Sequence, residues 1–240
     1  MVNAFSFCLY GPTRDIYHSG FLENVELVKR HYPGWVVYAY LGSDTEPAFR
    51  ERLLAEPVVR VRDTGVAGSK NMIHRFFAID EPDVDVCFFR DADSRIHWKD
   101  RWAIDSFMKT GCMCHIIRDN PEHNARIMGG LWGLRKGAIP SVRKLYAAWI
   151  PANDGFGNPN DVEGFGVDQN FAGLEVYPRV SERSLIHFSH NRLEDEMTMR
   201  FPFPYTNDIY CGRVQTVPFV DSPAPTMGPL SFVKIRMHIQ

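Results

Sequence analysis

Two aspartates separated by a single residue have the most direct chemical meaning in this sequence. Asp91 and Asp93 follow the apolar run 84–89 and stand in the segment Arg-Asp-Ala-Asp-Ser-Arg. Two carboxylates on one turn can face a single divalent cation, and hard oxygen ligands suit Mn²⁺ or Mg²⁺. Isolated pairs of this kind occur by chance in many surface turns, but here a predicted buried strand delivers the pair to a sheet edge. The pattern therefore predicts a metal site that also accepts oxygens from a diphosphate.

The segments that position this pair alternate between strand and helix patterns. We expect strands over 4–10, 35–42, 57–62 and 84–90, with helices that begin after a Ser19 cap, at Thr45 and after a Ser69 cap. This order implies an α/β fold with a mostly parallel sheet and helices on both faces. Ligands bind such sheets beyond the carboxyl ends of the strands. The segments that follow Tyr10, Gly42, Arg62 and Arg90 are therefore the places to look.

The second half of the chain has a less regular pattern. We expect helices over 99–109 and 141–150, strands over 112–118, 130–135 and 184–188, a loop over 153–166, and a short helix near 168–173. Residues 201–229 are Pro-rich with little periodicity. The prediction is one domain over residues 1–200, with halves 1–96 and 97–200, and a tail over 201–240 packed on it.

Three segments taken together resemble one enzyme family. Phe88–Ile96, His115–His123 and Met128–Gly137 look, in this order, like the nucleotide-sugar glycosyltransferases of the A-type fold. The similarity runs from about Met72 to His190 and is closest to small glycosyltransferases of bacteria and large DNA viruses. It implies the A-type fold, a nucleoside-diphosphate sugar (most simply a UDP-sugar) as donor, and a hydroxyl of a glycan or glycoconjugate as acceptor.

The resemblance also implies donor-binding roles. In that fold the D-x-D motif binds the metal under the donor diphosphate, so Asp91 and Asp93 would be metal ligands, and Asp91 could also touch the ribose. Gly129 and Gly130 would approach the donor sugar closely because they lack Cβ, although either glycine alone could equally mark a strand bulge. Arg75 lies where such enzymes place a nucleotide-contacting basic residue, and it could instead be the polar edge of its helix.

Further substrate-binding candidates lie at strand ends and in loops. Tyr10 and Gly11 end the first strand, where the base usually binds, and the Tyr10 ring could stack on uracil. Arg118 could pair with sugar hydroxyls or phosphate, or simply bond Asp119. Arg90, which opens the motif, is included among these candidates.

Glycosyl transfer also needs a group beside the sugar. An inverting enzyme uses a carboxylate base, and a retaining enzyme uses a nucleophile or close polar group on the opposite face. Asp168 is the catalytic candidate because it follows glycines near a predicted helix start, where an aspartate is also a good N-cap. Asp168 and Gln169 together resemble an Asp-Gln segment that lines the sugar site of some retaining families. The stereochemical outcome therefore stays open.

A late histidine often completes the metal shell in this fold class. His187 and His190 have opposite parity along a strand, so at most one is expected to face the site. His187, in an apolar-His pattern at the strand end, is the metal candidate. The alternative is a histidine that is simply part of the core.

Composition narrows the classes of function. A net charge of −2 argues against nucleic acid as a partner, while 20 arginines against 7 lysines leave anionic small ligands open. The sequence has no P-loop and no G-x-G-x-x-G. It also has no apolar run of membrane-spanning length and no leader, and its five cysteines lack zinc-site spacing. We therefore expect a protein with reduced thiols, no transmembrane segment and a cytoplasmic location.

Two alternatives compete with a glycosyltransferase. A sugar-phosphate nucleotidyltransferase would also use paired carboxylates and Mg²⁺, but it needs a Gly-rich basic loop after the first strand, and the segment Gly-Pro-Thr-Arg at 11–14 is a poor version. A non-catalytic nucleotide- or sugar-binding module would retain binding without transfer.

Overall fold

The apolar strands of the first ninety residues pair in parallel. A computed structural model describes residues 1–12, 15–150, 166–190, 198–216 and 219–225 of the chain. These strands are β1 (Val2–Leu9), β2 (Val36–Leu41), β3 (Val59–Asp63) and β4 (Val84–Arg90). They lie side by side in the order β3-β2-β1-β4, and each pairs in parallel with its neighbours. The bounds of β4 are those predicted, because its run of apolar residues ends at a charged turn. All four strands therefore deliver their carboxyl ends to one edge.

The second half adds four strands to the same sheet. The full order is β3-β2-β1-β4-β6-β5-β7-β8, and the new strands are β5 (Cys114–Arg118), β6 (Leu131–Arg135), β7 (Ser184–Phe188) and β8 (Thr198–Arg200). Strand β6 runs antiparallel to both β4 and β5, whereas β5, β7 and β8 are mutually parallel. The predicted α/β fold with a mixed, mostly parallel sheet is confirmed.

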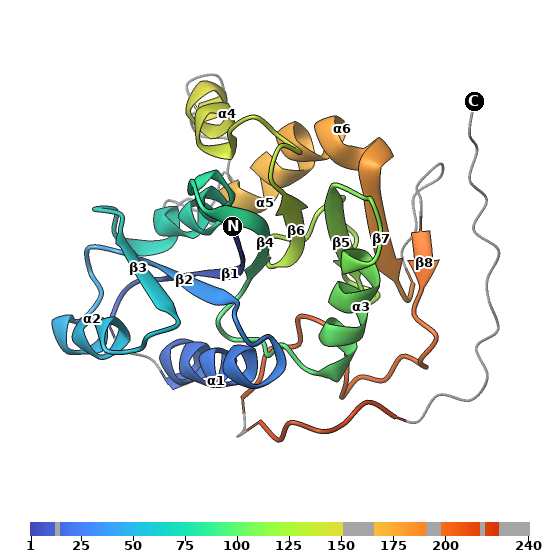
Figure 1. Ribbon diagram of the computed structural model, residues 1–240, viewed down its shortest axis with the longest axis horizontal. Helices are drawn as coiled ribbons and strands as arrows, with labels where there is room; N and C mark the ends of the chain where they lie inside the picture. The colour runs from blue at the N-terminus through green and yellow to red at the C-terminus, as the bar shows by residue number, and fades with distance from the viewer. Residues whose placement is uncertain (13–14, 151–165, 191–197, 217–218, 226–240) are drawn as a thin grey trace.

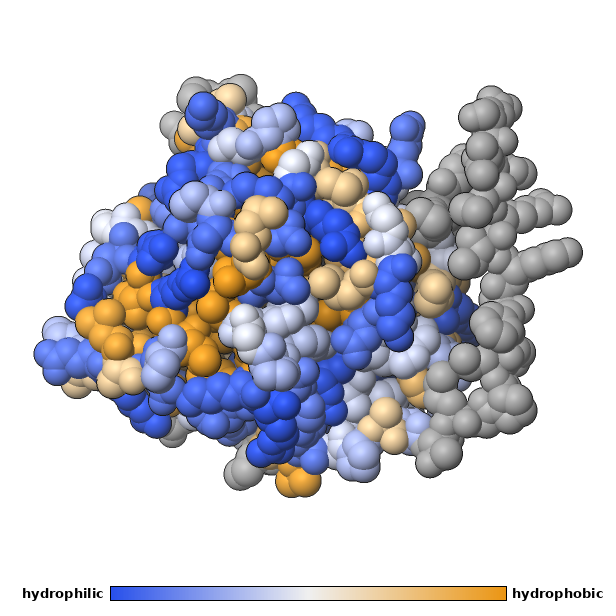
Figure 2. Space-filling model, in the orientation of Figure 1, coloured by the Kyte–Doolittle hydropathy of each residue, from blue (hydrophilic) through white to orange (hydrophobic). Residues whose placement is uncertain are grey.

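Helices cover both faces of this sheet (Figure 1). One apolar core packs under η1 (Gly68–Asp80), α4 (Val142–Trp149), α5 (Val167–Phe171), η3 (Ala172–Val176) and α6 (Tyr177–Val180), which the short η4 (Ser181–Arg183) follows. A second core packs under α1 (Asp15–His31), α2 (Pro47–Leu54) and α3 (Trp98–Met108). The space-filling view shows a mainly hydrophilic face, with hydrophobic residues gathered over β2 and β3 (Figure 2).

Three helix starts differ from the sequence prediction. Helix α1 begins at Asp15 and not after Ser19, since an acidic first residue already suits the helix dipole. Helix η1 begins at Gly68, whose φ of +67° turns the chain, so Ala67 holds the N-cap position and Ser69 lies within the first turn. Helix α5 follows Gly166 in the left-handed region, so Asp168 is the second helical residue and its N-cap role is wrong. The helix predicted over 141–150 is present as α4, and Ser141 is its N-cap, since its hydroxyl accepts the amide of Lys144 at 3.2 Å.

The described part of the tail lies along α3 and α1 (Figure 1). Phe201, Phe203 and Cys211 are buried in a small cluster with Trp98 of α3. Further along, the Asp221 carboxylate receives hydrogen bonds from Arg30, His31 and Arg101. Among the described residues, no helix has both the length and the apolar character needed to cross a membrane.

Candidate active site

A buried asparagine fastens η1 to the carboxyl edge of the sheet. The Asn71 side-chain amide donates to the carbonyl of Leu9 at 3.1 Å and to the carbonyl of Tyr40 at 3.2 Å. Leu9 is the last residue of β1 and Tyr40 the last but one of β2, so one side chain ties the helix to the ends of two strands. Arg75, one turn further along η1, is thereby held beside the carboxyl end of β4. Sequence analysis missed Asn71, whose only signal was a polar residue in a mostly apolar segment.

The guanidinium of Arg75 joins two carboxylates that are 77 residues apart in the chain. Nη1 donates to Asp91 Oδ1 and Nη2 to Asp168 Oδ2, each at 2.6 Å. The side chains of Arg75 and Asp168 are only 5% and 6% exposed, whereas that of Asp91 is 46% exposed. Burial raises the pKa of Asp168, and the charge of Arg75 opposes that shift. The cluster is therefore shielded from solvent at Asp168 and open to solvent at Asp91, and we call it the open cluster.

Two glycines let the backbone before β6 approach these carboxylates. A Cβ at Gly130 would lie 2.0 Å from Asp91 Oδ2, and a Cβ at Gly129 would lie 3.0 Å from both Arg75 Nη2 and Asp168 Oδ2. The Gly129 amide also donates to Gln169 Oε1 at 3.4 Å. The structure thus brings six candidates together from four parts of the chain: Arg75, Asp91, Gly129, Gly130, Asp168 and Gln169. Such contact favours the close-approach interpretation of both glycines over a mere bulge.

The D-x-D turn carries negative charge that Arg75 neutralises on one side only. Asp93 is partly buried, and burial together with the charge of Asp91 raises its pKa to about 6. Two mutually repelling carboxylates form an all-oxygen donor set that a hard divalent cation would stabilise, with further ligands from water and phosphate. The residues present therefore fit Mn²⁺ or Mg²⁺, and Asp91 and Asp93 would hold it.

His187 lies elsewhere. Its side chain is fully buried, its Nδ1 is 2.8 Å from His115 Nε2, and its ring packs on Trp102 and Phe201 on the α3 side of the sheet. Burial lowers the pKa of His187 to about 3. The structure therefore does not bring His187 to Asp91 and Asp93. His190 is exposed and packs on Tyr205.

The two candidate arginines of the strand ends are also structural in their contacts. Arg90 is 2% exposed and points to the α3 face, where Nη1 donates to the Gly130 carbonyl at 3.3 Å and Nη2 lies 3.6 Å from Asp100. Side chains alternate along β4, so Arg90 and Asp91 face opposite ways. Arg118 is 1% exposed and donates to the carbonyls of residues 125 and 126. Neither guanidinium reaches the carboxylate cluster.

The end of β1 borders the cluster. Tyr10 is partly buried, and burial, followed by the charge of Cys8, raises its pKa to about 12. Gly11 has a φ of +73° and turns the chain away from the strand. Thr13 and Arg14 lie outside the described residues. Cys8, which sequence analysis did not select, is a buried thiol whose pKa is raised by burial and is influenced by Arg75 and Asp168.

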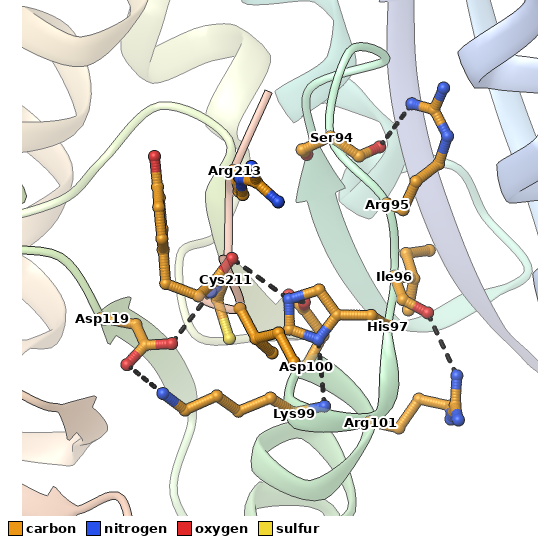
Figure 3. A network of polar contacts seen from close by, with 12 residues as sticks. Ser94, Arg95, Ile96, His97, Lys99, Asp100, Arg101, Asp119, Cys211 and Arg213 are labelled. Carbon is orange, nitrogen blue, oxygen red and sulfur yellow. Dashed lines mark hydrogen bonds and ion pairs between the residues drawn. The ribbon is translucent and has the colours of Figure 1, made fainter. Parts of the chain in front are cut away.

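Within the described ranges, one group of three potential metal ligands converges: His97, Asp100 and Cys211. His97 Nδ1 accepts the amide of Lys99 at 3.1 Å, so Nε2 carries the proton and donates to the Tyr210 carbonyl at 3.1 Å (Figure 3). A ring in this tautomer has no free nitrogen lone pair for a cation. The guanidinium of Arg90 beside Asp100 also disfavours a dication, so this group is a polar network.

Comparison with known proteins places the fold. No family model and no curated protein matches the chain. Glucosyl-3-phosphoglycerate synthase from Mycobacterium tuberculosis superposes with a TM-score of 0.51 and 10% identity, over 80% of this chain and 72% of that one. The fold is that of A-type glycosyltransferases. The expected similarity to proteins of large DNA viruses finds no support.

Three further solved structures match with lower TM-scores. TarS from S. aureus in complex with UDP has a TM-score of 0.49 and 12% identity, over 84% of this chain and 61% of that one. A Pyrobaculum calidifontis mannosyltransferase in complex with GDP-Man and Mn²⁺ has a TM-score of 0.43 and 10% identity, over 85% of this chain and 58% of that one. 4-Diphosphocytidyl-2C-methyl-D-erythritol synthase from Anaerococcus prevotii has a TM-score of 0.44 and 12% identity, over 80% of this chain and 88% of that one. The chain spans less than two thirds of TarS and of the mannosyltransferase.

Proposed function

We propose that this protein is a metal-dependent glycosyltransferase that moves a sugar from a nucleoside-diphosphate sugar, a UDP-sugar in the first instance, to a hydroxyl of a glycan or glycoconjugate. One observation carries the proposal. On the A-type fold, Arg75 joins Asp91 of the D-x-D turn to Asp168, and two glycines bring backbone against both carboxylates at the edge where ligands bind.

The donor diphosphate would lie over the open side of the cluster. Asp91 and Asp93 would hold Mn²⁺ or Mg²⁺, and the bound cation would neutralise charge that develops on the departing diphosphate. Arg75 keeps Asp91 in place through its 2.6 Å hydrogen bond. The base would lie at the end of β1, beside Tyr10 and Gly11, and the sugar would lie over Gly129 and Gly130.

Asp168 is the proposed catalytic residue. Its carboxylate is buried beside Gly129, where the sugar would lie, and Arg75 holds one of its two oxygens. Burial raises its pKa, which makes the carboxylate a stronger proton acceptor than an exposed aspartate. Asp168 would take the proton of the acceptor hydroxyl or act directly at the sugar, and Gln169 would orient the Gly129 backbone.

Calorimetry of UDP with and without Mn²⁺ tests the donor site, and a panel of nucleotide sugars tests Mn²⁺-dependent hydrolysis. We expect UDP to bind only with the cation and at least one nucleotide sugar to be hydrolysed. Metal-independent binding of UDP would overturn the proposed site. Release of pyrophosphate from a nucleoside triphosphate plus a sugar 1-phosphate, with no hydrolysis of any nucleotide sugar, would identify a nucleotidyltransferase instead.

A further inference from the structure

A second charged cluster connects the tail to the segment that carries the D-x-D motif. The Asp119 carboxylate is completely buried just beyond the end of β5. Oδ1 accepts Lys99 Nζ at 2.7 Å and the Ser189 hydroxyl, while Oδ2 accepts the backbone amide of Cys211 at 2.9 Å. One carboxylate thus joins the start of α3, the segment after β7 and the tail; Figure 3 shows its contacts with Lys99 and Cys211.

From Cys211 the tail runs directly to the D-x-D turn. Val214 forms an antiparallel bridge with Ser94, and the amide of Gln215 donates to the carbonyl of Asp93 at 2.8 Å. Between these points Gly212 has a φ of +83°, and a Cβ there would lie 2.8 Å from the Leu131 side chain. A glycine is therefore required for this path of the tail.

The turn is held from its other side by α1. The Asn24 amide donates to the carbonyl of Ser94 at 2.7 Å, and its oxygen accepts the amide of Ile96 at 3.0 Å. The Ser94 hydroxyl also donates to the carbonyl of Asp91 at 3.2 Å. The contacts from Asn24 and Ser94 hold the residues around Asp93, whereas the hydrogen bond from Gln215 is made to the backbone carbonyl of Asp93.

We propose that the tail segment Ile209–Gln215 is part of the cation site, and that Asp119 is a positioning residue that sets the conformation of Asp93 through this segment. Asp119 anchors the amide of Cys211, and four residues later the amide of Gln215 fixes the backbone of Asp93. The burial of Lys99 and Asp119 supports this role, because Asp119 cannot move away without leaving the buried Lys99 ammonium uncompensated, so the amide of Cys211 is held at a fixed place. The inference rests on the proposed function of Asp91 and Asp93 as cation ligands.

Gln215→Pro tests the link most locally, because proline removes the amide that reaches Asp93. Proline also favours an extended residue before it, which is the conformation that the bridging residue Val214 already needs. Thr216→Pro, at the exposed neighbouring position, is the matched control. We expect Gln215→Pro to weaken Mn²⁺-dependent binding of UDP at least about tenfold, the scale of losses at outer-shell partners of a metal site. Thr216→Pro should bind like the wild type.

Two further measurements keep the outcomes distinct. Hydrogen exchange of the metal-free protein should become faster in the peptide that contains residues 91–96 for Gln215→Pro, while the melting temperature stays near that of the control. Asp119→Asn should weaken UDP binding in the fraction that remains folded. Wild-type affinity in Gln215→Pro, while Asp93→Ala abolishes binding, would overturn the tail proposal alone. Wild-type affinity in Asp93→Ala would overturn the cation site and this inference with it.

Discussion

Two of the cation–carboxylate clusters among the described residues differ in their access to solvent rather than in their chemistry. In the first, Arg75 joins Asp91 and Asp168, and Asp91 remains 46% exposed beside backbone that only glycine allows. In the second, Lys99 and Asp119 are 1% and 0% exposed, and the carboxylate is occupied by three donors. A cation–carboxylate pair can therefore bind a ligand where one carboxylate is exposed to solvent. Where the carboxylate is buried and all its oxygens have donors, the pair can only hold other parts of the chain in position.

The largest effect is expected at the open cluster, the one formed by Arg75, Asp91 and Asp168, if it binds the donor and its cation. Asp93→Ala should abolish Mn²⁺-dependent binding of UDP, because the cation loses a charged oxygen ligand. Calorimetry with and without Mn²⁺ measures this. Asp63→Ala is the control, since Asp63 also ends a strand at this edge but pairs with Arg50 at the surface. Equal UDP affinity in both variants would contradict the assignment.

The closed cluster should respond through stability. Asp119→Ala leaves the Lys99 ammonium buried without its counter-ion, so we expect unfolding free energy to fall by about 3–5 kcal/mol. Asp63→Ala, which breaks an exposed ion pair, should lose no more than about 1 kcal/mol. Urea denaturation of the two variants gives the difference. Equal losses would mean that burial of Asp119 has no special structural role.

Asp168 belongs to the open cluster although it is itself buried, so its substitution sharpens the distinction. Asp168→Asn keeps the shape and should lower transfer at least about a hundredfold, the lower scale of general-base effects. Donor affinity should change far less, since Asp91 and Asp93 remain. Turnover and UDP affinity are measured on the same preparation. Unchanged turnover, or a loss fully explained by unfolding, would make Asp168 a structural partner of Arg75.

The free energy of unfolding should depend on pH in opposite directions for Asp93 and for the buried histidines His115 and His187. The pKa of Asp93 is raised from 3.8 to about 6, so in the metal-free protein its charged form destabilises the fold above pH 6. This penalty fades as the pH falls towards 3.8. Asp93→Asn should therefore be more stable than the wild type at pH 8, by on the order of 1 kcal/mol after allowance for partial exposure. Melting curves from pH 8 to 4 should show the difference shrinking, and a constant difference would contradict it.

The histidine pair should have the opposite pH dependence. The pKa of His187 is lowered from 6.5 to about 3 and that of His115 lies well below 6.5, both chiefly through burial. Their neutral forms therefore support the fold above pH 6.5, and that contribution is lost as the pH falls towards 3.

The smallest expected effect on the cation site comes from His187. His187→Ala should lower the melting temperature because it opens a cavity, yet leave Mn²⁺-dependent UDP affinity within about threefold of the wild type. His190→Ala, an exposed change, should affect neither. A loss of affinity as large as that of Asp93→Ala would place the imidazole on the cation.

Local pattern was sufficient for the strands and for the turn that carries the chemistry. The bounds of β4 and β7 agree with the prediction, because each is a short apolar run that stops at a charged or polar segment. The same local order of strands and helices predicted the mostly parallel sheet. Asp91 and Asp93 could therefore be selected from the strand pattern, which placed the D-x-D turn at the ligand edge, whereas the two glycines were selected through the resemblance to A-type glycosyltransferases.

Only the tertiary structure decided which distant groups meet. The helix pattern around Arg75 gave no sign of its hydrogen bond to Asp168, which lies 93 residues away in the chain. His187 had the right strand position, but its face of β7 turns towards α3 and His115. The link from Asp119 through Cys211 to Asp93 crosses most of the second half of the chain. Periodicity reports which residues are buried, whereas pairing between distant buried groups depends on how the elements pack.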